Sequence, residues 1–325
     1  MSTVCRMYTT DDIDALVQFW KENSGWDQID RTEWERRFYY TPFGSASIVL
    51  AMNDQSNEII GQFLFIPTRI YIDGREVKGF RPFAPVVKES VRSELGFMTL
   101  IEVVMKMYNH AMDEFRKEGV GLIHMLPDPR WSKAFQFLPG IQLDHFPLWS
   151  RPLPLNQIFD LPEGYSIRPI ASTDERINAL WEKSRELYGC SFLRNTTTLP
   201  WKASHGNYQL IGVFKHNDLV GFSSSIVKAH DKQWLICDLL AANADEAMEV
   251  TLKASCNLAQ EFLQSHEEVT LNKIAILATP LMQEKLEYLG FKKDEYRFPM
   301  VIQVLDDTIT QEQAAPKRWY ASAND

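Results

Sequence analysis

An internal repeat is the feature of this sequence that most limits how the chain can fold. The segment CRMYTTDDIDALVQFW, near the start, combines a short strand pattern with a Thr-Asp helix cap and an amphipathic helix, and IRPIASTDERINALW repeats that order at 167–181. A predicted hairpin follows in both halves, and its second strand opens with Gly61 or Gly221. Since chance could supply one match but not readily the whole order, we expect two copies of one mixed α/β unit.

The second part of each copy also keeps one order of elements. Each predicts a further strand, a long helix, a strand that ends in proline, a short helix, and a glycine followed by an apolar residue at Gly140 or Gly290. The first copy has 79 residues from Gly61 to Gly140, whereas the second has 69 from Gly221 to Gly290. We expect an N-terminal unit, a proline-rich linker, a C-terminal unit and a tail, at 1–150, 151–165, 166–307 and 308–325.

Composition narrows the class of protein. The chain has 325 residues, of which 45% are hydrophobic, and its net charge of −9 argues against a nucleic-acid partner, which would need a basic stripe. A cationic or neutral small substrate fits this charge better. We find no apolar run of roughly 18 residues and expect no membrane partner. The cysteines are widely spaced, without metal-ligand spacing, and are expected to be reduced thiols of a cytoplasmic protein: Cys5, Cys190, Cys237 and Cys256.

Four segments of the first copy carry a resemblance to a known superfamily: EWERRFYYTPFG, the strand IIGQ, VVKESVRSELGF and LPDPRWSKAFQFLPGI. Their order resembles that of the GNAT superfamily of acyl-CoA N-acyltransferases, and the whole chain resembles a tandem GNAT protein. The resemblance implies an α/β fold with a mixed sheet, and acetyl-CoA as acyl donor. It also implies that the cofactor lies between two splayed parallel strands, here the strands that end near Val87 and Leu126.

The stretch VVKESVRSELGFMTL predicts the end of a strand, then a polar loop with Arg92, Ser93 and Gly96, then the start of a helix, and it is the expected cofactor loop of the first copy. The superfamily pattern is Arg or Gln, two variable residues, Gly, one variable residue, then Gly or Ala, and it places backbone N–H groups of a helix start against a pyrophosphate. Arg92 fits the pattern, whereas Leu95 occupies the first glycine position. The alternative is a plain strand-to-helix connection. The cofactor-binding candidates are Val86, Val87, Arg92, Ser93, Leu95, Gly96 and Phe97.

The matching stretch of the second copy, DLLAANADEAMEVTLKASC, has no Arg or Gly and has an acidic helix start. Carboxylates stabilise the amino end of a helix but repel a pyrophosphate. We therefore expect one cofactor per chain, bound by the first unit.

Catalysis in this superfamily is implied to use direct attack of an amine on the thioester, with a backbone N–H of Val86 or Val87 polarising the carbonyl. A tyrosine often protonates the thiolate, but Gln136 and Leu286 occupy its positions in the two copies. Tyr320 of the tail is then a candidate acid. The candidate bases are His124, Asp128 and Glu89, with a core histidine, a turn aspartate and a solvated glutamate as the alternatives.

The tail carries two bulky aromatics, Trp319 and Tyr320, in an otherwise polar and Ala-rich segment. Leaving both in water would forfeit roughly 1.5–3 kcal/mol each, so we expect them to dock, either between the units or on an apolar patch.

The sequence thus predicts an N-acyltransferase that acetylates a small-molecule amine. Two alternatives stay open: a degenerate GNAT-like ligand-binding protein without chemistry, and an aminoacyltransferase of the peptidoglycan-peptide type. An acidic chain without a basic arm fits the tRNA use of the latter poorly.

Overall fold

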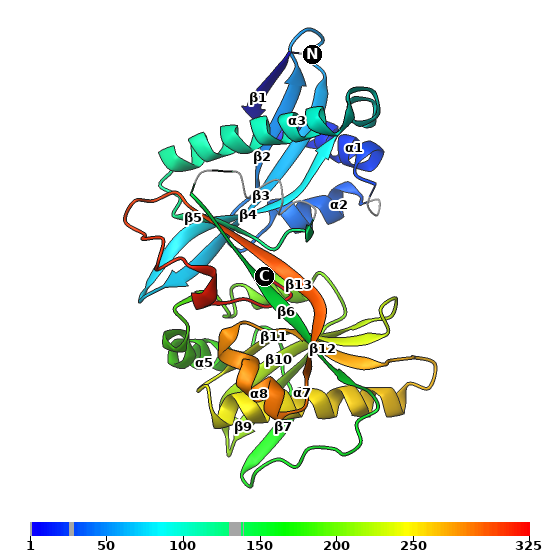
Figure 1. The fold of residues 1–325 in the computed structure, drawn as a ribbon, viewed down its shortest axis with the longest axis vertical. Helices are drawn as coiled ribbons and strands as arrows, with labels where there is room; N and C mark the ends of the chain where they lie inside the picture. The colour runs from blue at the N-terminus through cyan, green and yellow to red at the C-terminus, as the bar shows by residue number, and fades with distance from the viewer. Residues whose placement is uncertain (1, 26–28, 130–137, 139) are drawn as a thin grey trace.

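The computed structural model describes residues 2–25, 29–129, 138 and 140–325, with the side chains of 94–98 outside the description. Two α/β units lie end to end and share one continuous sheet, as Figure 1 shows. In the described part of the chain this sheet has 14 strands, with the path β1-β2-β3-β4-β5-β13-β6-β12-β11-β10-β9-β7. The predicted mixed α/β architecture is confirmed.

The first unit builds its part of the sheet from β1 to β5, and the long helix α3 lies across one face of it (Figure 1). Successive side chains of β3 point to opposite faces of the sheet and so contribute to a hydrophobic core on each face. Phe63 and Phe65 pack towards α3, whereas Leu64 and Ile66 pack towards α1 and α2. The elements are β1 (Thr3–Met7), η1 (Thr10–Asp12), α1 (Ile13–Asn23), α2 (Arg31–Trp34), η2 (Glu35–Tyr39), β2 (Ser47–Asn53), β3 (Ile59–Ile72), β4 (Arg75–Val87), α3 (Glu89–Lys117) and β5 (Leu122–Met125).

The second unit repeats this plan, with α7 packed on β10 and β11 as α3 packs on β2 and β3. Its buried core includes the apolar residues of α7, such as Leu252 and Ala259, and those of α8, such as Leu286. The elements are β7 (Tyr165–Pro169), α5 (Arg176–Ser184), η3 (Arg185–Leu187), β8 (Cys190–Phe192), α6 (Leu199–Ala203), β9 (Gln209–Lys215), β10 (Asp218–Lys228), β11 (Gln233–Ala241), α7 (Glu246–Ser265), β12 (Lys273–Leu277), η4 (Pro280–Met282), α8 (Gln283–Tyr288) and β13 (Lys292–Val304).

The two units exchange their last strands. β6 (Ile141–Pro152) ends the first copy but pairs with β12, whereas β13 ends the second copy and pairs with β5 through Val301–Val304. β6 and β13 also pair with each other, which makes the sheet continuous. Each unit therefore needs a strand from the other copy to complete its sheet, although the proline-rich segment between β6 and β7 separates the copies in sequence.

The tail docks where the two units meet (the red segment and the label C in Figure 1). Its strand β14 (Trp319–Tyr320) pairs with β8, and β8 pairs with the end of β3, so tail, second unit and first unit join in one ladder. Trp319 and Tyr320 are each 2% exposed, and the Trp319 ring centroid lies 5.1 Å from that of Phe192. The prediction that both aromatics are buried is confirmed. Trp319 packs between the units, whereas Tyr320 packs into the core of the second unit.

No helix within the described ranges combines the length and the apolar character needed to span a bilayer.

Candidate active site

β4 and β5 separate in the middle of the first unit's sheet. They pair in parallel at Gly79 with Leu122 and at Phe80 with Ile123, after which β4 continues to Val87 and β5 ends at Met125. A Cβ on Gly79 would lie 2.5 Å from Ile70 Cδ1, so glycine permits the close packing just before the strands part. A cavity of about 510 Å³ fills the opening, between residues 81–85 of β4 and residues 125–128, which are the last residue of β5 and the three that follow it.

A β-bulge shapes the β4 wall of this cavity. Phe83 faces Leu64 and Val86 faces Gln62, so β4 has two residues, Ala84 and Pro85, where β3 has one. Ala84 has a φ of 39°, a left-handed conformation that costs a non-glycine residue roughly 1–2 kcal/mol. Such strain is typical of functional sites.

Beyond the bulge, the strand presents a backbone donor to the opening. The Lys88 N–H donates to Ile60 O at 2.9 Å, and adjacent residues of a strand point their N–H groups to opposite sides. The Val87 N–H is therefore directed away from β3, towards the gap between β4 and β5. Val86 lies on the face packed against α1 and α2, where it is buried.

The expected cofactor loop is helical. α3 begins at Glu89, directly after the cap residue Lys88, so Arg92 and Ser93 lie in its first turns rather than in a loop. The Arg92 Nη2 donates to Asn23 O at 3.1 Å, and Ser93 Oγ donates to Glu89 O at 3.0 Å. The expectation of a loop was wrong because a lone glycine costs a helix only about 1 kcal/mol.

Other cofactor-binding candidates fall in the same helix. The backbone of Leu95, Gly96 and Phe97 belongs to α3, but their side chains lie outside the description. The Glu89 N–H at the helix start is already bonded to Asn23 Oδ1 at 3.1 Å. Cofactor binding by these residues stays a prediction.

Two smaller cavities, of about 40 and 200 Å³, lie on the other side of Arg81, where η2, α6 and the tail meet. Arg81 lines all three cavities, and Lys202 lines both smaller ones. Asp325 lines the large and the smallest cavity. The three cavities thus meet around one arginine, in walls supplied by both units and the tail.

A buried ionic cluster fixes the tail at this place. Arg194 contacts Asp238 at 2.7 Å and Asp325 at 2.6 Å, while Lys202 contacts Asp325 at 2.5 Å. These four side chains are at most 10% exposed and comprise two cations and two anions. Burial raises the pKa of Asp325, but Arg194 and Lys202 outweigh it and bring that pKa to about 2.

His124, a candidate base, lies on β5 and lines the smallest cavity. Its Nε2 is 3.0 Å from Thr68 Oγ1, and its ring centroid lies 4.4 Å from that of Phe192. Burial, followed by the charge of Arg81, lowers the pKa of His124 to about 3. The imidazole is therefore neutral at physiological pH, with the satisfied core contacts that were the alternative to a catalytic role.

The remaining acid and base candidates occupy different places. Asp128 is exposed and lines the large cavity, whereas Glu89 is exposed at the start of α3 and lines none of the three. Gln136 lies outside the described residues, and Leu286 is buried in the core of the second unit.

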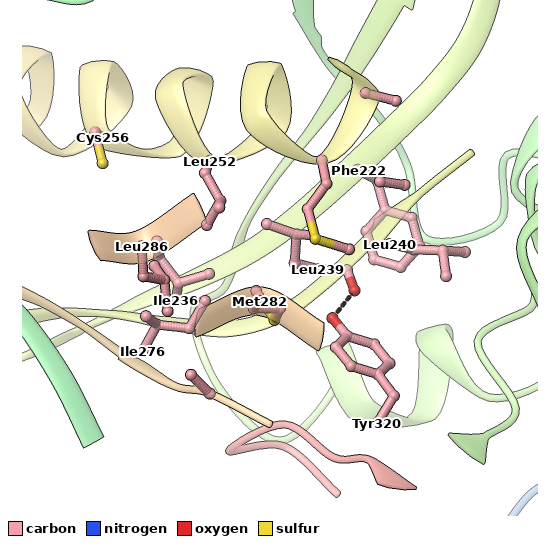
Figure 2. Packing of buried hydrophobic residues seen from close by; sticks show 14 of the residues in the cluster. Phe222, Ile236, Leu239, Leu240, Leu252, Cys256, Ile276, Met282, Leu286 and Tyr320 are labelled. Carbon is pink, nitrogen blue, oxygen red and sulfur yellow. Dashed lines mark hydrogen bonds between the residues drawn. The ribbon is translucent and has the colours of Figure 1, made fainter. Parts of the chain in front are cut away.

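Tyr320 lies in the core of the second unit instead of on a cavity. Its hydroxyl donates to Leu239 O, as Figure 2 shows, and its ring stacks on Tyr188 with centroids 4.4 Å apart. Burial raises the pKa of Tyr320 well above its usual value. This placement argues against Tyr320 as the acid that protonates a departing thiolate.

Tyr320 also occupies the place between β11 and β12 that corresponds to the opening between β4 and β5 in the first unit. β11 and β12 pair in parallel up to Ile236 and Ile276, and Leu239 lies just beyond that point on β11. Tyr320, Met282 and Leu286 pack together there in one apolar cluster (Figure 2). The space that corresponds to the large cavity is thus filled by the chain itself.

The residues that sequence analysis missed are Arg81, Lys202, Asp325 and His205. They come from β4, α6, the tail and the turn after α6, and the repeat pattern links none of them. A faint signal existed only for Arg81, a charged residue inside the apolar strand FRPFAPVV. Among the described residues, no group of three or more His, Cys, Asp or Glu side chains is arranged to bind a metal ion.

No protein-family profile matches the sequence, and a search of curated proteins found no match. Solved structures do match. A probable N-acyltransferase of unknown function from Enterococcus faecalis superposes with a TM-score of 0.68 at 10% identity, over 94% of this chain and 73% of that one. A GCN5-related N-acetyltransferase from Anabaena variabilis superposes with a TM-score of 0.68 at 11% sequence identity, over 94% of this chain and 73% of that one.

A tandem GNAT protein from the clavulanic acid biosynthesis pathway superposes with a TM-score of 0.56 at 14% identity, over 94% of this chain and 99% of that one. Together with the splayed strands and the repeated plan, these matches establish the architecture. The chain has the fold of the GCN5-related N-acetyltransferases, built from two such units in tandem.

Proposed function

We propose that this protein is an acyl-CoA-dependent N-acyltransferase that transfers acetyl from acetyl-CoA to the amine of a small molecule. The opening between β4 and β5, with its cavity of about 510 Å³ beside a strained bulge, carries the proposal. A thioester arm laid in this opening brings its carbonyl towards the Val87 N–H. One structural neighbour, the N-myristoyltransferase of Saccharomyces cerevisiae, contains bound myristoyl-CoA, which supports a CoA-type donor.

In the proposed reaction, the neutral amine attacks the thioester carbon from the side of the smaller cavities. The Val87 N–H stabilises the oxyanion, the C–S bond breaks, and the CoA thiolate leaves. Asp128 is the candidate base that is both exposed and on the large cavity, so it takes the ammonium proton through water. Water protonates the thiolate, because Tyr320 is enclosed in the core.

Cofactor binding is the first test. Acetyl-CoA at a hundred times its dissociation constant stabilises a protein by about 2.7 kcal/mol, which a thermal melt detects. Substituting Ala323→Phe, at a partly buried position on the large cavity, should abolish this shift by filling the cavity. Ala229→Phe, in the exposed turn between β10 and β11, is the matched control and should keep it.

Turnover is the second test, measured as free thiol released from acetyl-CoA over a panel of amines. Absence of a thermal shift in the unmodified protein would contradict the proposal. A shift without thiol release for any amine favours the alternative of a ligand-binding protein without chemistry, for which the helical start of α3 is the supporting observation.

A further inference from the structure

Arg81 has an unusual environment for an arginine. It extends from β4 to line all three cavities and is partly buried. Within the described part of the chain, its one hydrogen-bond acceptor is a main-chain oxygen of Asp325, the last residue of the sequence, at 2.9 Å from Nη1, and no Asp or Glu side chain forms an ion pair with it. A guanidinium carries five N–H donors, so most of the hydrogen-bonding capacity of Arg81 is left for a ligand.

No acidic side chain is paired with Arg81 in the described part of the chain. Arg194 and Lys202 are matched by the side chains of Asp238 and Asp325 in the buried cluster, which leaves Arg81 without a side-chain carboxylate as its partner there. Asp325 is the one carboxylate residue on the two smaller cavities among the described residues, and it is already used in that cluster. The smallest cavity adds a second cation, Arg69, which has no ion pair in the described ranges.

The histidines do not change this balance. Burial lowers the pKa of His205, on the cavity of about 200 Å³, to about 4, with Arg36 as the next cause, and His124 is neutral for a similar reason. Burial also lowers the pKa of Arg81, an effect that the nearby Asp325 opposes. A bound anion would likewise favour the charged form of Arg81.

We infer that the acceptor of the proposed transfer is an amine that also carries a carboxylate, such as an amino acid, and that Arg81 binds this carboxylate. A planar guanidinium matches a carboxylate in a two-point contact. The apolar walls, which include Phe43, Ile66, Phe83 and Trp201, suit a single negative charge beside a small hydrocarbon body. The inference rests on the proposed function for the amine, but the carboxylate contact is independent of it.

The proposed carboxylate contact was not expected from the net charge of −9, which favoured a cationic or neutral substrate. Net charge is dominated by exposed side chains, whereas a ligand responds to the few groups that line its cavity. Those groups are cationic here.

Binding of unreactive analogues tests the carboxylate contact without requiring turnover. The probes are N-acetylglycine, N-acetylalanine and N-acetylleucine, each compared with its carboxamide by calorimetry on the full chain. We expect at least one acid to bind about tenfold more tightly than its amide, the size of effect that a charge-assisted hydrogen bond gives. Arg81→Gln should remove this preference, and Arg81→Lys should retain part of it.

Arg116→Gln is the matched control, because Arg116 is half exposed on the last turn of α3 and contacts Asp113 at 3.3 Å. It should leave the acid preference unchanged. Circular dichroism and thermal melts verify that each variant is folded. If Arg81→Gln does not fold, the Arg81→Lys variant tests the contact instead. A preference for the acids over the amides that is weaker than in the unmodified protein would still support it.

Three results would overturn the inference: acids and amides that bind equally, no binding of any acid at millimolar concentration, or an acid preference that survives Arg81→Gln. A weaker affinity for acetyl-CoA in Arg81→Gln, with acid binding unchanged, would assign Arg81 to the donor instead. Failure of the proposed function has a different signature, because the protein would then bind the acids but show no acetyl-CoA shift.

Discussion

Replacing Asp325 by asparagine tests how the tail is held at the cavities. The side chain contacts Arg194 at 2.6 Å and Lys202 at 2.5 Å and is inaccessible to solvent. Asp325→Asn keeps the size of the side chain but leaves two buried cations facing one buried anion, Asp238. The perturbation is therefore electrostatic and is confined to one cluster.

The structure sets the magnitude in two ways. A folded-state pKa of about 2, against the ordinary 3.8, corresponds to roughly 2 kcal/mol of stability. Removing one partner of a buried ion pair costs about 3–5 kcal/mol, because the other charge stays uncompensated. We expect Asp325→Asn to lower the free energy of unfolding by about 2–4 kcal/mol in urea titrations at neutral pH.

Acidification provides an internal check. A depressed carboxyl pKa contributes stability above the unfolded-state value of 3.8, and that stability is lost as the pH falls towards 2. The difference in free energy of unfolding between the unmodified protein and the Asp325→Asn variant should therefore become smaller below about pH 4. Asp307→Asn, at an exposed position, is the control and should be neutral. A loss of stability below about 1 kcal/mol, or one that does not shrink in acid, would show that the Asp325 carboxylate does not stabilise the buried cluster.

Three further predictions concern the strands, a histidine and the cofactor. Gly79→Val should cost about 1–3 kcal/mol in thermal melts, since its Cβ would lie 2.5 Å from Ile70 Cδ1; an unchanged melting temperature contradicts the packing described. His124 should stay neutral down to about pH 4 in nitrogen-15 NMR, because its pKa is about 3; titration near 6.5 would show an exposed ring. Calorimetry should give one acetyl-CoA per chain, because Tyr320 fills the second opening, and a stoichiometry near two would rule that out.

Local sequence patterns were sufficient for the repeat and the mixed α/β class, whereas the splayed strands near Val87 and Leu126 were expected from the family resemblance. The repeat and the class depend on the period of apolar residues, on glycine and on proline, which act over a few residues. The same local reasoning failed at Arg92–Gly96. There the family pattern predicted a loop, but one glycine did not interrupt a segment that otherwise favours a helix.

The strand exchange was not predictable from the sequence. β6 and β13 hold equivalent places in the two copies, so moving each into the other unit preserves the apolar pattern that every strand requires. The two arrangements differ only in which copy supplies the partner strand. That choice depends on contacts between residues more than a hundred positions apart, such as Val301 and Met125.

Short-range periodicity and hydrophobic burial were enough to predict the repeated order of the main helices and strands and the burial of the tail's aromatics. The charges that line the cavities depend on the complete fold. Arg81, Lys202 and Asp325 are distant in the chain and meet only when the sheet is complete and the tail has docked. A cavity lined by Arg69, Arg81 and Lys202 can therefore exist in an acidic protein, because the fold, and not the composition, determines which charged side chains face a ligand.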